Sequence, residues 1–315
     1  MNYVILDLEW NTSFSSKKKK YVNEIIEFGA VKTDESMQIT DRFSMLITPQ
    51  IGKKLSTHVQ ELTHITFDQL ESAHNTFSHV AKCFEKFLGD GVLLTWSTSD
   101  ILALIDNYSY YYHSEKLPFL TKYCNLQSYC EKSLGQYSSS NQLGLSACCE
   151  MLKIDRENFS EHRAADDAEL SFYCLKKLYD EPKLRAMTEL AKTDEFYRKL
   201  TFKNHYLTDI NNPNIDKSVM FFDCPQCSQK MTQKTPWALK GKCFAADFAC
   251  DTCRDEYLGR ISFKLRYDET AVKKKLISKE EIKEKQQHIQ QEIEKGKEKK
   301  ARRAVNKAKQ NKNIK

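Results

Sequence analysis

The stretch YVILDLEWN, from Tyr3 to Asn11, places two carboxylates directly after a run of four apolar residues. Such a run predicts a buried β-strand, and alternate side chains of a strand point to the same face. Asp7 and Glu9 are therefore expected to lie side by side. Neighbouring carboxylates repel each other, so the arrangement is costly unless a cation lies between them. The alternative is that the strand ends at Leu6 and that both acids are solvated.

The first 180 residues alternate between strand-like and helix-like segments. Three successive strands come before the first helix and favour an antiparallel meander, whereas the later alternation of strands and helices favours crossover connections. We therefore expect an α/β fold in which a mixed sheet carries helices on both faces. After the first strand, the hydrophobic spacing predicts strands at residues 24–33, 42–49 and 91–96, and helices at residues 67–88, 100–112, 143–152 and from about 165.

A third acid, Asp100, follows the strand predicted at residues 91–96 and stands at the start of a predicted helix. An Asp in this position has an ordinary explanation as a helix cap. Asp106 is a rival candidate, but it would lie well inside the helix and on a different face.

His162 and Asp167 form an H-x4-D pattern at the start of the last predicted helix. Asp166 and Asp167 both suit a helix N-terminus, because the helix dipole favours negative charge there. A lone His in this place is more often a surface or capping residue than a catalyst.

The order and spacing of these residues resemble the DEDDh exonuclease family, the superfamily of RNase T and the DNA polymerase III ε subunit. The segments 24–32 and 62–66 resemble the second strand of that family and the short stretch after its third strand. The resemblance covers about residues 1–180 and implies an RNase H-like fold. The chain departs from the family pattern after the D-x-E pair, where Trp10 and Asn11 replace the usual Thr and Gly, and around Asp100.

The resemblance implies hydrolysis at the 3′ end of a nucleic acid with two Mg²⁺ or Mn²⁺ ions held by the acids. Asp7 would bridge both ions, Glu9 and Asp167 would bind the first, and Asp100 would act partly through water. His162 would be the general base, since a histidine accepts a proton near neutral pH. The implied catalytic set is therefore Asp7, Glu9, Asp100, His162 and Asp167.

Trp10 and Asn11 directly follow the D-x-E pair and are candidate substrate contacts. The indole ring of Trp10 would stack on the last base of the substrate. The alternative is that strand alternation turns the ring into the core.

Five of the eleven cysteines crowd into a short C-terminal region. CPQC (Cys224, Cys227) and CDTC (Cys250, Cys253) are two knuckles whose spacing is typical of a zinc ribbon with four thiolate ligands and a structural Zn²⁺. Cys243 is left over and is expected to be a small buried residue. Lysines and aromatics are mixed in this region, and they form either a surface for single-stranded nucleic acid or a small aromatic core under a solvated face: Lys230, Lys234, Lys240, Lys242, Trp237, Phe244 and Phe248.

The basic charge of the chain is concentrated at its C-terminal end. Residues 273–315 contain 16 Lys and Arg against 6 Glu, which gives this segment a net charge of +10. Because the net charge of the whole chain is +6, residues 1–272 carry a net charge of −4 and are mildly acidic. This tail is expected to be a solvated helix or disordered, and either solubilises the protein or attracts phosphates. No apolar run is long enough for a membrane span, and the first strand begins too early for a signal peptide, so a cytoplasmic location is expected.

The sequence thus predicts four segments: an exonuclease domain at 1–182, a helical connector at 183–219, a zinc ribbon at 220–268 and a basic tail at 269–315. The expected activity is a 3′→5′ exonuclease that releases nucleoside monophosphates from single-stranded nucleic acid with a free 3′ end, with RNA slightly favoured over DNA. One alternative is a proofreading subunit of a DNA polymerase. Another is a nucleic-acid-binding adaptor with incidental catalysis, against which the complete catalytic set argues. Protein partners are not predicted.

Overall fold

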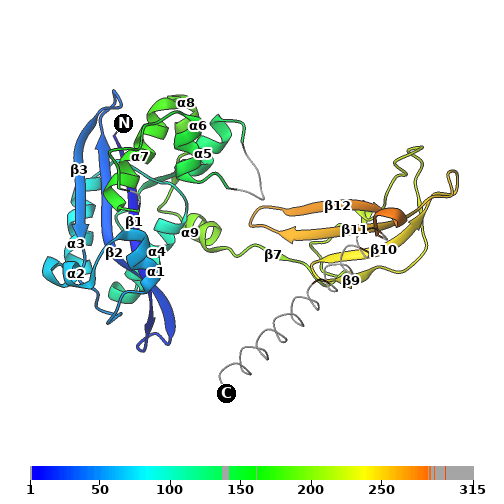
Figure 1. Cartoon of the computed structure of the whole chain (residues 1–315), viewed down its shortest axis with the longest axis horizontal. Coiled ribbons are helices and arrows are strands. Elements are labelled where there is room, and N and C mark those ends of the chain that lie inside the picture. The colour runs from blue at the N-terminus through cyan, green and yellow to red at the C-terminus, as the bar shows by residue number, and fades with distance from the viewer. Residues whose placement is uncertain are drawn as a thin grey trace, which may run out of the picture. The chain divides into compact units, whose positions relative to one another are not determined.

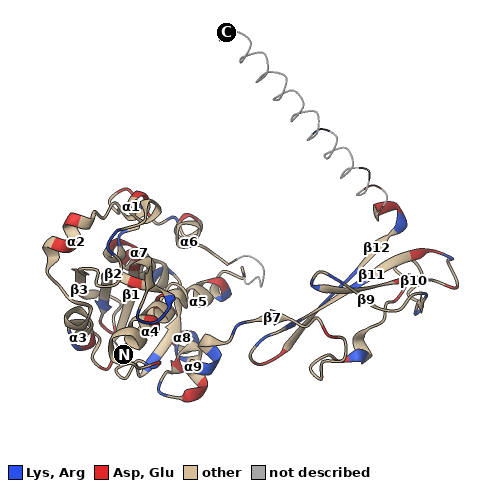
Figure 2. Ribbon diagram, turned by 90° about the horizontal axis from the view of Figure 1, so that it is seen from below, with Lys and Arg blue, Asp and Glu red and all other residues tan. Residues whose placement is uncertain are grey.

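The computed structural model describes residues 2–136, 142–160, 162–282, 284, 287 and 295. The chain divides into two units, residues 1–201 and residues 202–315 (Figure 1). Lys and Arg are interspersed with Asp and Glu in both units (Figure 2). No helix among the described residues has the length and apolar character that a membrane crossing requires.

A mixed six-stranded sheet forms the centre of the first unit, as the sequence predicts. The strands run in the order β3-β2-β1-β4-β5-β6, and β1 lies in the middle. β1, β2 and β3 are antiparallel, β4 and β5 run parallel to β1, and β6 is antiparallel to β5. The strands are β1 (Tyr3–Ser15), β2 (Lys20–Thr33), β3 (Ile39–Leu46), β4 (Val92–Thr95), β5 (Lys122–Asn125) and β6 (Glu189–Leu190).

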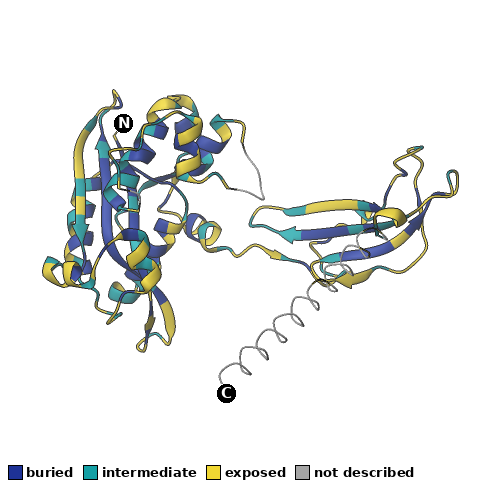
Figure 3. Ribbon diagram, in the orientation of Figure 1, coloured by how far each residue is buried: buried dark blue, intermediate teal, exposed yellow. Residues whose placement is uncertain are grey.

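Side chains of β1 alternate between two cores on opposite faces of the sheet. Val4, Leu6 and Leu8 pack with α3 (Phe77–Leu88) and α4 (Ser99–Tyr112). Tyr3 and Ile5 pack on the other face, so the expected helices on both faces are confirmed (Figure 3). The helices of this second face are α5 (Leu126–Ser133), α6 (Leu145–Met151), α7 (Ala164–Lys177) and α8 (Glu181–Met187). Asp7 and Glu9 continue the alternation on this second face.

The helix predicted at residues 67–88 is two helices, α2 (Phe67–Ala73) and α3. His74 ends α2 in the left-handed conformation, with φ of 51°. The Thr76 side chain then accepts a hydrogen bond from the His79 backbone and starts a new helix. Three further elements of this unit lie where the sequence predicts none: α1 (Thr57–Thr63), β5 and α5.

The connector predicted at residues 183–219 is divided between the two units. α8, β6 and α9 (Asp194–Thr201) belong to the first unit, because Ala191, Phe196 and Tyr197 are buried in its core. The remaining residues belong to the second unit, in which β7 (His205–Tyr206) pairs with β11 (Glu256–Leu265). The sequence predicted helical structure in this connector but not the core in which its apolar residues are buried.

The second unit contains a twisted antiparallel sheet in the order β12-β11-β10-β8, with β7 on β11 and β9 on β10. Phe244 and Phe248 are only 3% and 2% exposed, and the Trp237 ring lies 5.5 Å from that of Phe248. The aromatics of this unit therefore form its core and leave few rings for base stacking. Its elements are η1 (Lys217–Val219), β8 (Thr232–Gln233), β9 (Ala238–Lys240), β10 (Cys243–Ala249), β11 (Glu256–Leu265) and β12 (Thr270–Ser278).

β12 lies within the segment that the sequence assigns to the basic tail. It pairs with β11 over its whole length, from Thr270 to Ser278, and so belongs to the folded sheet. Three successive lysines interrupt the alternation of apolar and polar residues by which a strand is predicted from sequence. An edge strand can carry such charges, because its side chains are exposed to solvent. Beyond Ile282 only residues 284, 287 and 295 are described, so the rest of the predicted tail lies outside the described residues.

Candidate active site and candidate zinc centre

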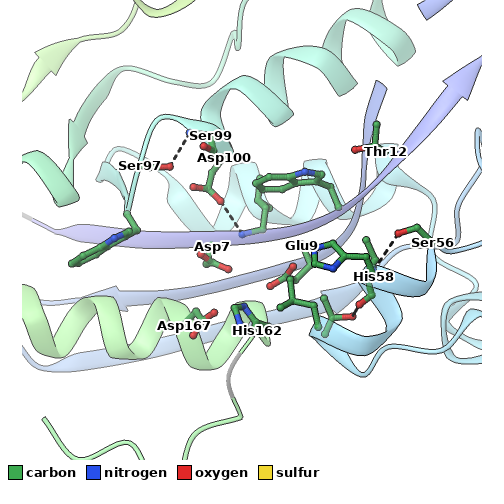
Figure 4. Close-up of a pocket in the computed structure, with 16 residues that line it drawn as sticks. Asp7, Glu9, Thr12, Ser56, His58, Ser97, Ser99, Asp100, His162 and Asp167 are labelled. Carbon is green, nitrogen blue, oxygen red and sulfur yellow. Dashed lines mark hydrogen bonds between the residues drawn. The ribbon is translucent and has the colours of Figure 1, made fainter. Parts of the chain in front are cut away.

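All five predicted catalytic residues line one cavity of about 480 Å³ in the first unit. They come from β1, from the start of α4, and from the first turn of α7 and the segment just before it. Figure 4 shows Asp7 between Asp100 on one side and Asp167 on the other, with Glu9 and His162 beside them. Residues up to 160 positions apart in the sequence therefore meet in one place.

β1 continues past both of its acids. In the register with β2, Asp7 lies opposite Gly29 and Glu9 lies opposite Glu27. A bulge follows between Glu9 and Trp10, where the register with β2 shifts by one residue. The alternative in which the strand ends at Leu6 is therefore wrong, and both carboxylates project from a regular strand toward α7.

Gly29 allows α7 to begin directly against the sheet beside Asp7. A Cβ atom at this position would lie 2.0 Å from the backbone of Ala164 and of Ala165, far inside van der Waals contact. Any larger residue would push the helix away from β2. Because Asp167 is in the first turn of α7, this close approach brings its carboxylate to that of Asp7.

An ion pair between Glu27 and Arg163 fixes the start of α7. The Arg163 guanidinium donates to the Glu27 carboxylate at 2.7 Å, and the Ala164 backbone N–H donates to the same carboxylate at 3.2 Å. A buried carboxylate is well placed there, because the helix dipole makes its N-terminus positive. The sequence analysis missed this pair, since its members are 136 residues apart and the only signal is a charged residue within a buried strand.

Asp100, and not Asp106, reaches the cavity from α4. Its Oδ1 accepts a hydrogen bond of 3.1 Å from the Leu8 backbone N–H, which is free because β4 pairs with β1 only as far as Leu6. Asp106 lies on the surface and pairs with Lys20 at 3.1 Å. On α7, the Asp166 carboxylate accepts from the Ser160 backbone, which leaves Asp167 as the acid of this helix in the cavity.

His162 precedes α7 in the left-handed conformation, with φ of 60°, and is exposed. Ligand atoms of Glu9, His162 and Asp167 all lie within 4.8 Å of one another. The imidazole is therefore at the open side of the acid cluster, where it reaches both water and the carboxylates.

Three acids of the cavity, Asp7, Glu9 and Asp100, have a pKa above that of an ordinary carboxyl group. Burial, followed by the charges of Asp100 and Asp167, raises the pKa of Asp7 well above its usual value. Burial and the charge of Asp167 raise the pKa of Glu9 to about 8, and burial raises that of Asp100 to about 7. Several hard oxygen donors gathered in one cavity fit divalent cations such as Mg²⁺ or Mn²⁺.

We expect the metal-free protein to lose stability as the pH rises from 6 to 8. The folded-state pKa of Glu9, about 8, is above its ordinary value of 4.5. Between these values the unfolded chain has released a proton that the folded chain keeps, so the free energy of unfolding falls as the pH rises. Thermal unfolding in EDTA should show a lower midpoint at pH 8, and added Mg²⁺ should restore it. A midpoint in EDTA that rises over this range would contradict the prediction.

A family model described as an exonuclease, RNase_T, matches residues 4–175, which are more than half of the chain. The chain belongs to this exonuclease family. The predicted DEDDh membership and the RNase H-like fold are thereby confirmed, and the cavity lies inside the matched exonuclease domain. Comparison with curated proteins found no match.

Solved structures similar to the exonuclease domain share its fold at low sequence identity. One is described as the "crystal structure of full-length 3'-exonuclease", with 23% identity and a TM-score of 0.50, covering 58% of this chain and 62% of that chain. Another is the nuclease domain of 3'hExo, "a DEDDh family member, bound to rAMP", with 23% identity and a TM-score of 0.48, covering 58% and 94%. The chain thus spans about three fifths of the first of these proteins.

The two residues after the D-x-E pair have different environments in the exonuclease domain. Trp10 is half-buried, packs against the core on one side and lines the cavity on the other. Asn11 is 3% exposed and is not among the residues that line the cavity. Its amide donates to the Lys54 carbonyl and to Ser13, and its carbonyl accepts from the Ser56 backbone. Asn11 therefore positions the loop before α1.

α1 supplies part of the cavity wall that the sequence analysis did not predict. Ser56 caps this helix by accepting a hydrogen bond from the Val59 backbone, and His58 lies in its first turn at the cavity. The preceding loop is held by the buried Glu24 carboxylate, which accepts three backbone N–H groups from residues 50–52. The sequence signal for α1 is the Ser at its N-cap.

The four predicted zinc ligands meet in the second unit. The Sγ atoms of Cys224, Cys227, Cys250 and Cys253 all lie within 4.8 Å of one another, and Cys243 is not among them. The two knuckles have the same turn geometry. The carbonyls of Cys224 and Cys250 accept from the backbones of Ser228 and Arg254, which both have a φ near 60°. The arrangement fits a metal with four sulfur ligands.

Proposed function

We propose that this chain is a metal-dependent 3′→5′ exonuclease that releases nucleoside monophosphates from single-stranded nucleic acid, preferably RNA. The observation that carries the proposal is the convergence of Asp7, Glu9, Asp100 and Asp167 on one cavity, with His162 at its open side. An acidic cavity repels the phosphates of a substrate unless cations occupy it, which supports metal-dependent cleavage.

Asp7, Glu9, Asp100 and Asp167 would hold two Mg²⁺ or Mn²⁺ ions between them. When bound, these ions acidify the attacking water and stabilise the leaving 3′ oxygen and the charge on the phosphate. His162 takes the proton from the water at its imidazole nitrogen. The Glu27–Arg163 pair keeps α7 in place, so that Asp167 and His162 stay in register with β1.

A preference for RNA is supported by the polar rim of the cavity. Ser56, His58 and Thr12 offer hydroxyl and imidazole groups at the cavity, where they can bond a ribose 2′-hydroxyl. This hydroxyl is the group by which proteins distinguish RNA from DNA. Trp10 offers its ring to the terminal base, a contact that does not depend on base identity.

We also propose that the cysteine cluster binds one structural Zn²⁺. Two CxxC knuckles with matched geometry bring four thiols together. The residues that the structure describes around the cluster offer no carboxylate or histidine ligand in the same group, which favours a closed site.

The activity is tested with 5′-labelled RNA and DNA oligonucleotides of the same sequence. We expect stepwise shortening from the 3′ end in Mg²⁺ or Mn²⁺, faster for RNA, and none in EDTA. A 3′-phosphate in place of the free 3′-hydroxyl should slow the first step. Intact oligonucleotides in both metals would refute the proposed function, and faster cleavage of DNA would refute the preference for RNA.

We expect His162→Asn to lower kcat by about 10²- to 10⁴-fold, because the general base is lost. Asn tolerates the left-handed backbone of this position but cannot accept the proton. Stabilisation by Mg²⁺ in thermal unfolding should remain, and the dependence of kcat on an ionisable base should disappear from the pH profile. His58→Asn is the matched control and should change KM more than kcat. Equal kcat in the His162 variant and the wild type would show that His162 is not the base.

A further inference from the structure

One face of the sheet in the second unit carries a group of cations on neighbouring strands. The opposite face is the core face, where Gly259, Ile261 and Phe263 of β11 are buried. Arg260 and Lys264 alternate with these residues and therefore point the other way. We define the basic face as Arg260 and Lys264 of β11 with Lys273 and Lys275 of β12. Lys and Arg of these strands are coloured in Figure 2.

The register of the strands places one pair of like charges directly opposite each other on this face. Arg260 pairs with Lys275, and its neighbour on β10 is Ala245. Lys273 is opposite Ser262, and Lys264 is opposite Ala271. A like-charged cross-strand pair destabilises a sheet, and Ala245, which lies opposite Arg260 on the other side, carries no charge to compensate it.

The cations of the basic face are available to an anionic ligand. Lys273 and Lys275 are exposed, and Arg260 is half-exposed. Among the described residues, no acidic side chain forms an ion pair with Arg260, Lys273 or Lys275. Neighbours on one strand are about 6.6 Å apart at this spacing, so they form a row of charges that an extended polyanion can follow.

Tyr206 adds an aromatic ring to the same face. It pairs directly with Lys264 and therefore shares its face. The ammonium groups of Lys242 and Lys264 lie 5.2 and 5.9 Å from the centre of its ring. Cations beside a partly exposed aromatic ring are the combination with which proteins bind the backbone and bases of single strands.

Protection of the sheet edge is the simpler explanation for lysines on β12, because charged edge strands resist aggregation. Edge protection explains the presence of lysines on both faces of β12. It does not explain Arg260, since β11 is an interior strand between β10 and β12. Nor does it explain why Arg260 lies opposite a lysine.

We infer that the basic face binds the backbone of single-stranded nucleic acid and thereby retains the substrate whose 3′ end is being degraded. The inference deepens the proposed function and rests on it. The cations make phosphate contacts, which position a strand without reading its sequence. The part of the chain before residue 273 is net acidic, so a separate basic surface helps it to hold a polyanion.

The test compares two double variants of the full chain, both in an Asp7→Asn background that prevents cleavage. Lys273→Gln/Lys275→Gln removes two charges from the basic face. Lys230→Gln/Lys274→Gln removes the same charge elsewhere, since both side chains lie over the Phe221 ring and Lys274 is on the opposite face of β12. Affinity for a 20-nucleotide RNA of non-repetitive sequence is measured against salt concentration, together with zinc content and thermal midpoint.

For single strands the slope of log affinity against log salt is about −0.7 per neutralised phosphate. We expect the Lys273/Lys275 variant to flatten this slope by about 1.4 and to bind more weakly, and the Lys230/Lys274 variant to keep the wild-type slope. In the active background, Lys273→Gln/Lys275→Gln should leave cleavage of a trinucleotide unchanged. Equal slopes for the two double variants would overturn the inference. So would equal competition by polyglutamate, which would mean that the face takes any polyanion.

A single variant of Arg260 provides a second test in case Lys273→Gln/Lys275→Gln disturbs the pairing of β12 with β11. Arg260→Gln alone should flatten the slope by about 0.7 and raise the thermal midpoint, since it relieves the repulsion with Lys275. An unchanged slope would count against the inference. Cleavage by the wild-type protein is measured in a separate assay, so failure of the proposed function is distinguishable from failure of the basic face.

Discussion

Asp7→Asn is expected to abolish cleavage, with a loss of about 10³-fold or more. Asp7 lies at the centre of the cavity, between Asp100 and Asp167, and Asn keeps its shape but removes a charge that would hold both metal ions (Figure 4). The same change should make the metal-free protein more stable, because it removes an acid whose pKa is raised by burial and by the charges of Asp100 and Asp167. Activity and stability therefore change in opposite directions.

Asp106→Asn is the matched control for this variant. Asp106 is on the same helix as Asp100, but its carboxylate pairs with Lys20 on the surface. Asp106→Asn should change cleavage little, because Asp106 does not line the cavity. It should also change stability little, because isolated surface ion pairs contribute about 0–1 kcal/mol to stability. The measurements are kcat/KM in Mg²⁺ and the thermal midpoint in EDTA. Near-normal cleavage by Asp7→Asn would exclude the proposed mechanism. A thermal midpoint of Asp7→Asn in EDTA below that of the wild type would exclude the explanation given for the raised pKa of Asp7.

Cys224→Ser should release the zinc and unfold the second unit while the exonuclease domain stays folded. Binding of a structural Zn²⁺ contributes on the order of 10 kcal/mol in small zinc domains. The second unit has its own small core around Phe222 and Phe248, and a core of that size gives little stability without the metal. The first unit has separate cores on both faces of its sheet, so it does not depend on the metal.

Cys243→Ser is the control, because Cys243 is on β10 in the same unit but outside the cluster. Elemental analysis should find about one Zn²⁺ per chain in the wild type and in this control, and none in Cys224→Ser. Proteolysis should then degrade the second unit of Cys224→Ser first. Freshly purified wild-type protein without zinc would contradict the proposal, as would a Cys224 variant that resists proteolysis as well as the control.

Local patterns were sufficient to predict the elements that carry the site. Alternation along a strand placed Asp7 and Glu9 on one face, and the start of a predicted helix placed Asp100, as the structure shows. The knuckle spacing brought together the four cysteines. Each of these predictions depends on geometry that is fixed within a few residues of the chain.

The parts that the sequence did not predict depend on contacts between distant segments. Nothing in the sequence around Glu27 or Arg163 indicates that they pair, because they meet only when α7 packs on β2. Asn11 follows the catalytic acids in the sequence, yet its side chain is used by a loop more than forty residues away. β12 was assigned to the tail because a strand at the edge of a sheet need not bury alternate residues.

The contact between Gly29 and the start of α7 has a consequence for synthesis of the protein on the ribosome. Asp7 and Glu9 are on β1, whereas His162 and Asp167 follow about 150 residues later in the chain. A nascent or truncated chain that ends before Ala164 has Asp7, Glu9 and Asp100 but neither the helix that seats on Gly29 nor the last acid. The acid cluster is therefore complete only when α7 has been added to the chain, and a fragment that ends before this helix is expected to have no nuclease activity.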